Sequence, residues 1–201
     1  LRSIEDITQV LKSGADKISI NTAAIKNPNL IKEASLSFGS STIVVAIEAI
    51  KESSGKYLAY TDNGREFTGI DVFEWAQQVE DLGAGEIIIS YVDKEGSGEG
   101  FDIELTKMIS NSVSIPVIAH GGAGSVSDVV DVIKIGNADA VSIASILHYG
   151  LKDEIDMKRL SENSEGNLEF LNKKTSYNKI KPVNLIDLKK ELINNNINCR
   201  I

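Results

Sequence analysis

Short, uninterrupted apolar segments recur along the chain, and each one leads into a polar loop and then into a helical pattern. Five of them are predicted strands, at residues 17–21, 43–50, 86–92, 115–120 and 140–145. They are rich in Ile, Val and Ala and do not alternate with polar residues, which is typical of parallel strands covered on both faces. Useful chemistry is therefore expected where these strands end.

A repeated pattern indicates how the strands are connected. The segments SGADKISIN at 13–21, LGAGEIIIS at 82–90 and IGNADAVSIAS at 135–145 each predict a helix that ends near glycine, a tight turn and a buried strand. Consecutive βα units of this kind favour a barrel wound in one direction. A doubly wound open sheet is the alternative.

The number of predicted strands is too small for a closed barrel. Eight strands close a (βα)8 barrel in about 250 residues, whereas this chain offers five. Leu1 is not Met and lies inside a helical pattern, so the absent strands are expected before it. The predicted fold class is α/β, a (βα)8 TIM barrel of which the last five βα units are present, with 1–201 as a single partial TIM-barrel domain.

Two segments interrupt the succession of βα units. Residues 51–68 predict a β-hairpin inserted after the second strand, because the turn sequence Asp62-Asn63-Gly64 separates two β-prone arms. Its position over a strand end makes it a candidate lid. Residues 151–182 are polar and rich in Lys and Asn, which predicts a surface insertion with little regular structure. A last helix is expected around Leu188.

Composition excludes several classes of function. The net charge of −8 argues against nucleic acid as a partner, because phosphate backbones are bound by clustered Lys and Arg. No apolar run approaches the roughly 20 residues of a membrane span, so a cytoplasmic protein is expected. One cysteine, Cys199, and two histidines leave no disulfide framework and predict no metal site.

Residues at two sets of strand ends are predicted to bind phosphate. Glycines allow close approach of the backbone, and free N–H groups at a helix start attract anions. The alternative is that the Gly-Gly pair only forms a tight turn. The related motifs ISINTAAI and VSIASI suggest two anion sites across the barrel, and hence a ligand with two phosphates. The residues are Gly121, Gly122, Ala144 and Ser145 in one set, and Asn21 and Thr22 in the other.

Two carboxylates are the candidate catalytic residues. Glu48 and Asp93 each come at the end of a predicted strand, where two carboxyl groups in unlike environments can divide acid and base roles. The alternative is that either side chain only orients a loop or pairs with a lysine. His120 could bind a phosphate or donate a proton. Asp16 and Lys17 lie at the opposite ends of the strands, where charges are usually structural or interfacial.

Seven motifs in this order and spacing resemble the cyclase subunit of imidazole glycerol phosphate synthase over residues 2–150 and again over 183–200. They are GADKISINTAAIKNP, FGSSTIVVAIEA, TGIDVFEWA, LGAGEIIISYVDKEG, GFDIEL, SIPVIAHGGAG and ASILHYG. The resemblance implies a (βα)8 barrel that receives ammonia from a glutaminase partner and needs no cofactor or metal. It further implies a carbon-nitrogen lyase that closes a ring on a bisphosphorylated ribulosyl aminoimidazole carboxamide intermediate. The implied pathway is histidine biosynthesis.

The resemblance also assigns residues to roles. It implies that Asn21 and Thr22 hold one phosphate, and that Glu48 stands where the family has a catalytic Asp. It places Asp16 and Lys17 on the face that docks the glutaminase and admits ammonia. The second phosphate site corresponds to Gly96, Gly122, Ala144 and Ser145. The family's other catalytic Asp lies on the first strand, which is absent here, so the chain alone is expected to be inactive.

The departures from the family pattern cluster at the mouth of the barrel. They are Glu48 for Asp, Ser90 for Thr, Glu95 for Asp and His120 for Ser. A displacement of about 1 Å in a catalytic group can cost on the order of 100-fold in rate. Two alternatives therefore stay open: an ammonia-channelling partner in sugar amidation for surface polysaccharide, and an inactive fragment or interaction module.

Overall fold

The computed structural model describes residues 1–152 and 179–200. Its strands join into one seven-stranded sheet, in which β1 pairs with β2 and the remaining order is β4-β3-β2-β5-β6-β7. Five strands run parallel: β1 (Ile18–Ile20), β2 (Ile43–Lys51), β5 (Glu86–Tyr91), β6 (Val117–His120) and β7 (Ala140–Ser142). The segment 151–182, predicted as a polar insertion, lies for the most part outside the described residues.

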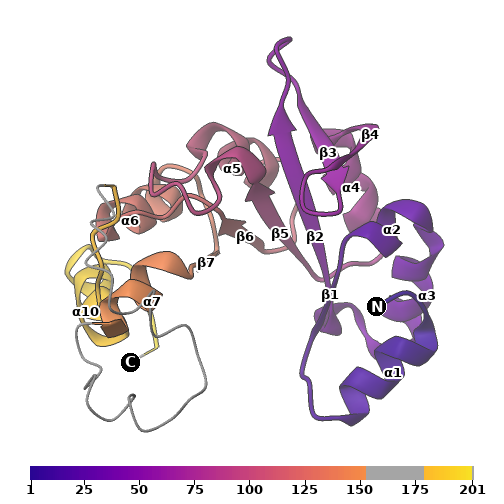
Figure 1. Ribbon diagram of the computed structural model, residues 1–201. Helices are drawn as coiled ribbons and strands as arrows, with labels where there is room; N and C mark the ends of the chain where they lie inside the picture. The colour runs from indigo at the N-terminus through magenta and orange to yellow at the C-terminus, as the bar shows by residue number, and fades with distance from the viewer. Residues whose placement is uncertain (153–178, 201) are drawn as a thin grey trace, which may run out of the picture.

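Helices follow the parallel strands and lie along the outer side of the sheet, which forms an open arc (Figure 1). None of the helices in the described ranges combines the length and the apolar character that crossing a membrane requires. The helical elements are α1 (Ile4–Lys12), α2 (Thr22–Lys26), α3 (Asn29–Phe38), η1 (Ser40–Thr42), α4 (Val72–Asp81), η2 (Val92–Lys94), α5 (Ile103–Ser110), α6 (Val126–Lys134), α7 (Ser145–Lys152) and α10 (Leu185–Asn194).

Side-chain caps fix where several helices begin. Asp71 accepts hydrogen bonds from the backbone N–H groups at the start of α4, and Asp102 does the same for α5. Ser125 and Asp128 form the predicted capping box of α6. Each cap satisfies N–H groups that have no partner inside the helix, so the preceding loop ends at a defined residue.

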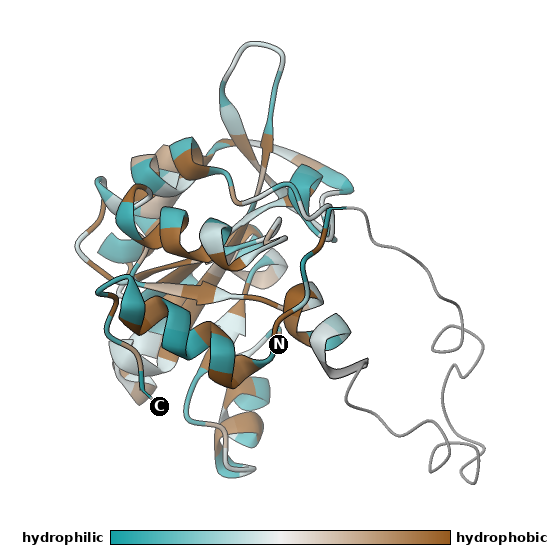
Figure 2. Ribbon diagram, turned by 90° about the vertical axis from the view of Figure 1, so that its left-hand side faces the viewer, coloured by the Kyte–Doolittle hydropathy of each residue, from teal (hydrophilic) through white to brown (hydrophobic). Residues whose placement is uncertain are grey.

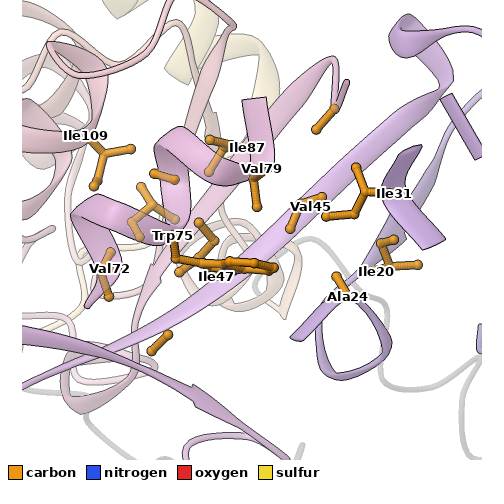
Figure 3. Packing of buried hydrophobic residues seen from close by; sticks show 14 of the residues in the cluster. Ile20, Ala24, Ile31, Val45, Ile47, Val72, Trp75, Val79, Ile87 and Ile109 are labelled. Atoms are coloured by element: carbon orange, nitrogen blue, oxygen red, sulfur yellow. The ribbon is translucent and has the colours of Figure 1, made fainter. Parts of the chain in front are cut away.

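The main apolar core lies between the sheet and its covering helices. Trp75, the one tryptophan of the chain, is 1% exposed and packs from α4 among side chains of the sheet (Figure 3). Val45 and Ile47 of β2 and Ile87 of β5 are fully buried in the same cluster. Apolar colour follows the strands and the sheet-facing sides of the helices (Figure 2).

The concave side of the sheet is less covered than the sequence predicts. Ser19 and Ala140 are exposed on this side, and Ala46, Ile88 and Ile118 are half-buried. The alternate residues of the same strands are buried against the helices. The predicted parallel α/β sheet is confirmed. Among the described residues β1 pairs only with β2 and β7 only with β6, so this sheet is open at both edges.

The five parallel strands lie where the sequence predicts them, although the bounds of each differ by one to three residues. The last strand ends at Ser142, not at 145, because α7 begins at Ser145 and takes over the apolar run. β2 extends to Lys51 because its second half pairs with β3 in antiparallel register.

The region in which a hairpin is predicted contains β3 (Tyr57–Thr61) and β4 (Glu66–Asp71). β3 pairs antiparallel with the end of β2, from Glu48 opposite Tyr60 to Lys51 opposite Tyr57. β4 then pairs antiparallel with β3, with an irregularity between Leu58 and Tyr60. These strands therefore extend the edge of β2 beyond the point where β1 ends.

A polar cluster ties this extension to helix α5. The hydroxyl of Tyr57 donates to Asp102 Oδ2 at 2.9 Å and lies 3.4 Å from Glu104 Oε2. Lys51 Nζ donates to Glu104 Oε2 at 2.7 Å and lies 4.9 Å from the centroid of the Tyr57 ring. Burial raises the pKa of Tyr57 well above its usual range, although the hydrogen bond with Lys51 acts in the opposite direction.

We expect three of the five tyrosines to ionise late in an alkaline titration followed by phenolate absorbance. The pKa of Tyr57 and of Tyr91 is raised chiefly by burial, and that of Tyr60 chiefly by its hydrogen bond to Glu52. The folded state therefore keeps protons that the unfolded state loses above pH about 10, so stability should fall as the pH rises further. Tyr57→Phe should remove one late-ionising group. A single ionisation of all tyrosines near pH about 10 would contradict this assignment.

Candidate functional site

A cavity of about 790 Å³ opens at the carboxyl ends of β1 and β2, beneath the turn between β3 and β4. Polar and charged side chains of both signs surround it. The lining residues are Leu1, Arg2, Ser19, Ile20, Asn21, Thr22, Ala23, Lys26, Asn27, Glu48, Asp62, Asn63 and Glu66. Of the residues predicted for a site, the cavity brings together Asn21, Thr22 and Glu48.

The carboxylate of Glu48 is held by the backbone of the β3–β4 turn. Gly64 donates its N–H to Glu48 Oε2 at 2.9 Å. Asp62, Asn63 and Gly64 have φ values of 54°, 57° and 76°, so three successive residues adopt left-handed conformations. This backbone bends the turn back toward the strand ends, and its N–H fixes the position of the carboxylate.

Asn21 and Thr22, which follow β1, also line the cavity. Asn21 is the residue before α2, yet its side chain does not cap that helix. Its Oδ1 atom is buried without a hydrogen-bond partner in the described part of the chain. An amide oxygen only accepts hydrogen bonds, so this atom is available to a ligand group that donates one, such as a hydroxyl. Arg2 and Lys26 bring positive charge to the cavity, and Glu48, Asp62 and Glu66 bring negative charge, with Lys26 Nζ 4.0 Å from Glu66 Oε2.

The second predicted phosphate set lies farther along the same edge of the sheet, outside this cavity. Gly121 and Gly122 have φ values of 90° and 105°. A Cβ atom on Gly122 would lie 2.2 Å from the carbonyl oxygen of Gly100. The backbone N–H of Gly100 in turn donates to the carbonyl oxygen of Gly122 at 2.8 Å. These glycines therefore allow two loops to pack backbone to backbone.

The remaining members of that set occupy the loop after β5 and the start of α7. Gly96 has a φ of 71° and open space around its Cα. Ser145 is the first residue of α7 and not the end of a strand, and the carbonyl of Ala144 accepts the N–H of His148 at 2.8 Å. The structure thus places the two predicted phosphate sets on one edge, separated by the ends of β2 and β5.

Asp93 does not share the cavity with Glu48. β5 ends at Tyr91, and Asp93 lies exposed in the short helix η2, so the expectation that Asp93 ends its strand is wrong. Its negative charge instead helps to raise the pKa of Tyr91 and of Tyr60. Burial is the first cause of the raised pKa of Tyr91, and the negative charge of Asp93 is the second.

A row of polar side chains runs across the concave side of the sheet. Glu48 is in register with Ser90, Ser90 with His120, and His120 with Ser142. His120 Nδ1 lies 3.2 Å from the Ser142 carbonyl oxygen, and its Nε2 lies 3.5 Å from Glu95 Oε1. The sequence indicated His120 as a phosphate or proton-transfer residue, but only the loop fold reveals that Glu95 contacts it.

At the opposite end of the strands, Lys17 Nζ donates to Glu86 Oε1 across β2. Asp16 is exposed beside this pair. Nowhere in 1–152 or 179–200 do three His, Cys, Asp or Glu side chains gather in a way that would hold a metal ion.

The fold and the cavity define an α/β protein of serial βα units with a polar site at the carboxyl ends of its parallel strands. A family model described as "Histidine biosynthesis protein" matches residues 1–153. The chain therefore belongs to the histidine biosynthesis protein family.

Two curated relatives carry the same name, imidazole glycerol phosphate synthase subunit HisF. The protein of Alkaliphilus metalliredigens (strain QYMF) is 45% identical over 163 residues, which cover 81% of this chain and 64% of the relative. That of Methanococcus vannielii is 48% identical over 187 residues, covering 83% of this chain and 68% of the relative. The chain thus spans about two thirds of the length of these relatives.

We expect Gly64→Ala to destabilise the protein more than Gly55→Ala does. Both glycines have left-handed φ values, 76° and 86°, so both substitutions carry a similar backbone cost of about 1–3 kcal/mol. A Cβ on Gly64 would also lie 2.6 Å from Val92 Cγ1, whereas Gly55 has open space. The overlap should add about 1–3 kcal/mol, measured by urea unfolding followed by Trp75 fluorescence. Equal losses in the two variants would show that the turn is not packed against Val92.

Proposed function

We propose that this protein is the cyclase subunit of imidazole glycerol phosphate synthase in histidine biosynthesis. The observation that carries the proposal is the 45% and 48% identity to two proteins of that name over more than four fifths of this chain. The site supports it, because Glu48, whose carboxylate is held by the Gly64 N–H, lines one polar cavity together with Asn21 and Thr22.

In the proposed reaction, ammonia closes a ring on a bisphosphorylated ribulosyl aminoimidazole carboxamide intermediate. A carbon-nitrogen bond breaks, giving imidazole glycerol phosphate and an aminoimidazole carboxamide ribotide. No cofactor takes part in this scheme. The net charge of −8 makes the chain poorly suited to the polyanionic surface of nucleic acid.

We infer that the five parallel strands are the last five βα units of a (βα)8 barrel. β1 and β7 each have one strand neighbour in the described residues, and the concave face between them is only half-buried. Parallel sheets occur almost only with both faces covered, so three further units would complete the site. The 201-residue chain alone should accordingly be inactive.

We assign Glu48 as a proton-transferring carboxylate and Asn21 with Thr22 as one phosphate site. The second phosphate site comprises Gly96, Gly121, Gly122, Ala144 and Ser145. The assignment of Asn21 and Thr22 has more direct support than that of the second site, because these two residues line the cavity together with Glu48. Asp93 is left out of the catalytic assignment because it is exposed and turned toward Tyr91.

Ammonia is proposed to come from a glutaminase subunit docked at the opposite ends of the strands. Asp16 and Lys17 lie there, and the Lys17–Glu86 ion pair spans the concave side of the sheet. In a barrel, that pair would stand between the docking face and the cavity that holds Glu48.

The test supplies the full-length protein with ammonium salt and the ribulosyl intermediate. We expect imidazole glycerol phosphate to form without the glutaminase. Glu48→Gln should lower kcat by about 10²–10⁴-fold, because it removes a general acid or base while keeping the side-chain size. Glu48→Asp should restore part of the rate. Glu33→Gln, on the exposed side of α3, serves as the matched control and should leave kcat unchanged.

Absence of imidazole glycerol phosphate above background would reject the proposed activity. Ammonia-dependent amidation of a sugar phosphate by the same preparation would then favour a partner in polysaccharide synthesis. No turnover with either substrate would favour an interaction module.

A further inference from the structure

His120 is held in one ring orientation, with one nitrogen left for chemistry. Its Nδ1 lies 3.2 Å from the carbonyl oxygen of Ser142 on the neighbouring strand. A carbonyl oxygen only accepts hydrogen bonds, so Nδ1 must carry the proton in this contact. In the neutral ring Nε2 is then an unprotonated base.

The free nitrogen of His120 faces a carboxylate. Nε2 lies 3.5 Å from Glu95 Oε1. No hydrogen bond joins these atoms while both lack a proton, but a proton gained by Nε2 would convert the contact into an ion pair. The imidazole side chain is 28% exposed, so a ligand can reach it.

The loop backbone brings Glu95 to this position. Gly96, Gly98 and Gly100 have φ values of 71°, 68° and 83°, so alternate residues of the loop adopt left-handed conformations. The Gly100 N–H donates to the Gly122 carbonyl at 2.8 Å, which fastens the loop to the turn after His120. The contact is therefore part of a defined loop packing.

His120 lies at the strand ends between the two predicted phosphate sets. Asn21 follows β1 and Gly121 follows β6, so in sheet order the ends of β2 and β5 lie between them and His120 ends β6. The side chains in register there are Glu48, Ser90 and His120. Adjacent strands are about 4.8 Å apart, which places Glu48 and His120 about 10 Å from each other along the row.

We propose that His120 is a catalytic residue of the cyclase reaction, with Glu95 as the carboxylate that stabilises its protonated form. This inference rests on the proposed function. As the ammonia nitrogen bonds to the ribulosyl ketone carbon, the carbonyl electron pair moves to oxygen and one N–H proton moves to Nε2. The imidazolium then returns that proton to the alkoxide oxygen. The product is a carbinolamine, and His120 is neutral again.

The variant His120→Asn separates this role from a structural one. The asparagine amide nitrogen can take the place of Nδ1 and donate to the Ser142 carbonyl, but nothing replaces the base at Nε2. In the full-length protein with ammonium salt, we expect kcat to fall about 10²–10⁴-fold with KM changed only a few-fold and the melting temperature preserved. Glu95→Gln should lower kcat by about tenfold, because the protonated imidazole would lose a hydrogen bond to a charged group, and such a loss has an effect of about that size.

His148→Asn is the matched control. His148 is the other of the two histidines in the 201 residues, and it lies in α7, outside the row formed by Glu48, Ser90, His120 and Ser142. This variant should leave kcat unchanged. In the 201-residue chain it also leaves His120 as the one histidine for two-bond ¹H–¹⁵N correlation NMR, where the neutral ring should be the Nδ1–H tautomer at the alkaline end of a pH series.

The outcomes are distinguishable. An inactive wild-type protein rejects the proposed function itself. If the wild type is active and the His120→Asn variant is equally active, only the catalytic role of His120 is rejected. The contact between His120 and Glu95 would then serve to hold the loop against β6. An Nε2–H tautomer in the neutral ring would also overturn the proposal, since that nitrogen could not then accept a proton.

Discussion

The parallel register of β2, β5 and β6 is the constraint on which the rest of the structure depends. It places Glu48, Ser90 and His120 in one row on the concave side, while Ile47 and Ile87 face the helices and are fully buried. Because successive side chains of a strand point to opposite faces, a slip of one residue would expose the isoleucines and bury the polar row. The apolar layer beneath the helices therefore fixes the geometry of the site.

The same register leaves an apolar row under the polar one. Ala46, Ile88 and Ile118 are aligned across the three strands and are only half-buried. Burying a large aliphatic side chain contributes about 1.5–3 kcal/mol, so covering this face is favourable. In the barrel that we propose, the units that cover these isoleucines would also enclose Glu48 and His120. Stability and an enclosed site would then arise from one packing event.

Much of this arrangement could be predicted from the sequence. The five strands and the cap at Ser125 follow from local patterns, and the structure confirms them. The end of β7 was misplaced because the apolar run continues into α7 without a break. Asn21, Thr22 and Glu48 were identified from their places at strand ends, and they share a cavity. The pairing of His120 with Glu95 depends on how a glycine-rich loop folds, which no periodic pattern encodes.

The glycines after β6 affect the site through the backbone as well as through any ligand that they bind. A Cβ on Gly122 would overlap the Gly100 carbonyl, at 2.2 Å, and would push the 95–100 loop away from β6. Glu95 lies at the start of that loop and would lose its position opposite His120. Loss of activity on substitution of Gly122 is therefore ambiguous evidence for a phosphate site. Gly96 has open space around it, but its left-handed φ of 71° makes a substitution there strained as well, and Gly96 is the neighbour of Glu95 in the same loop.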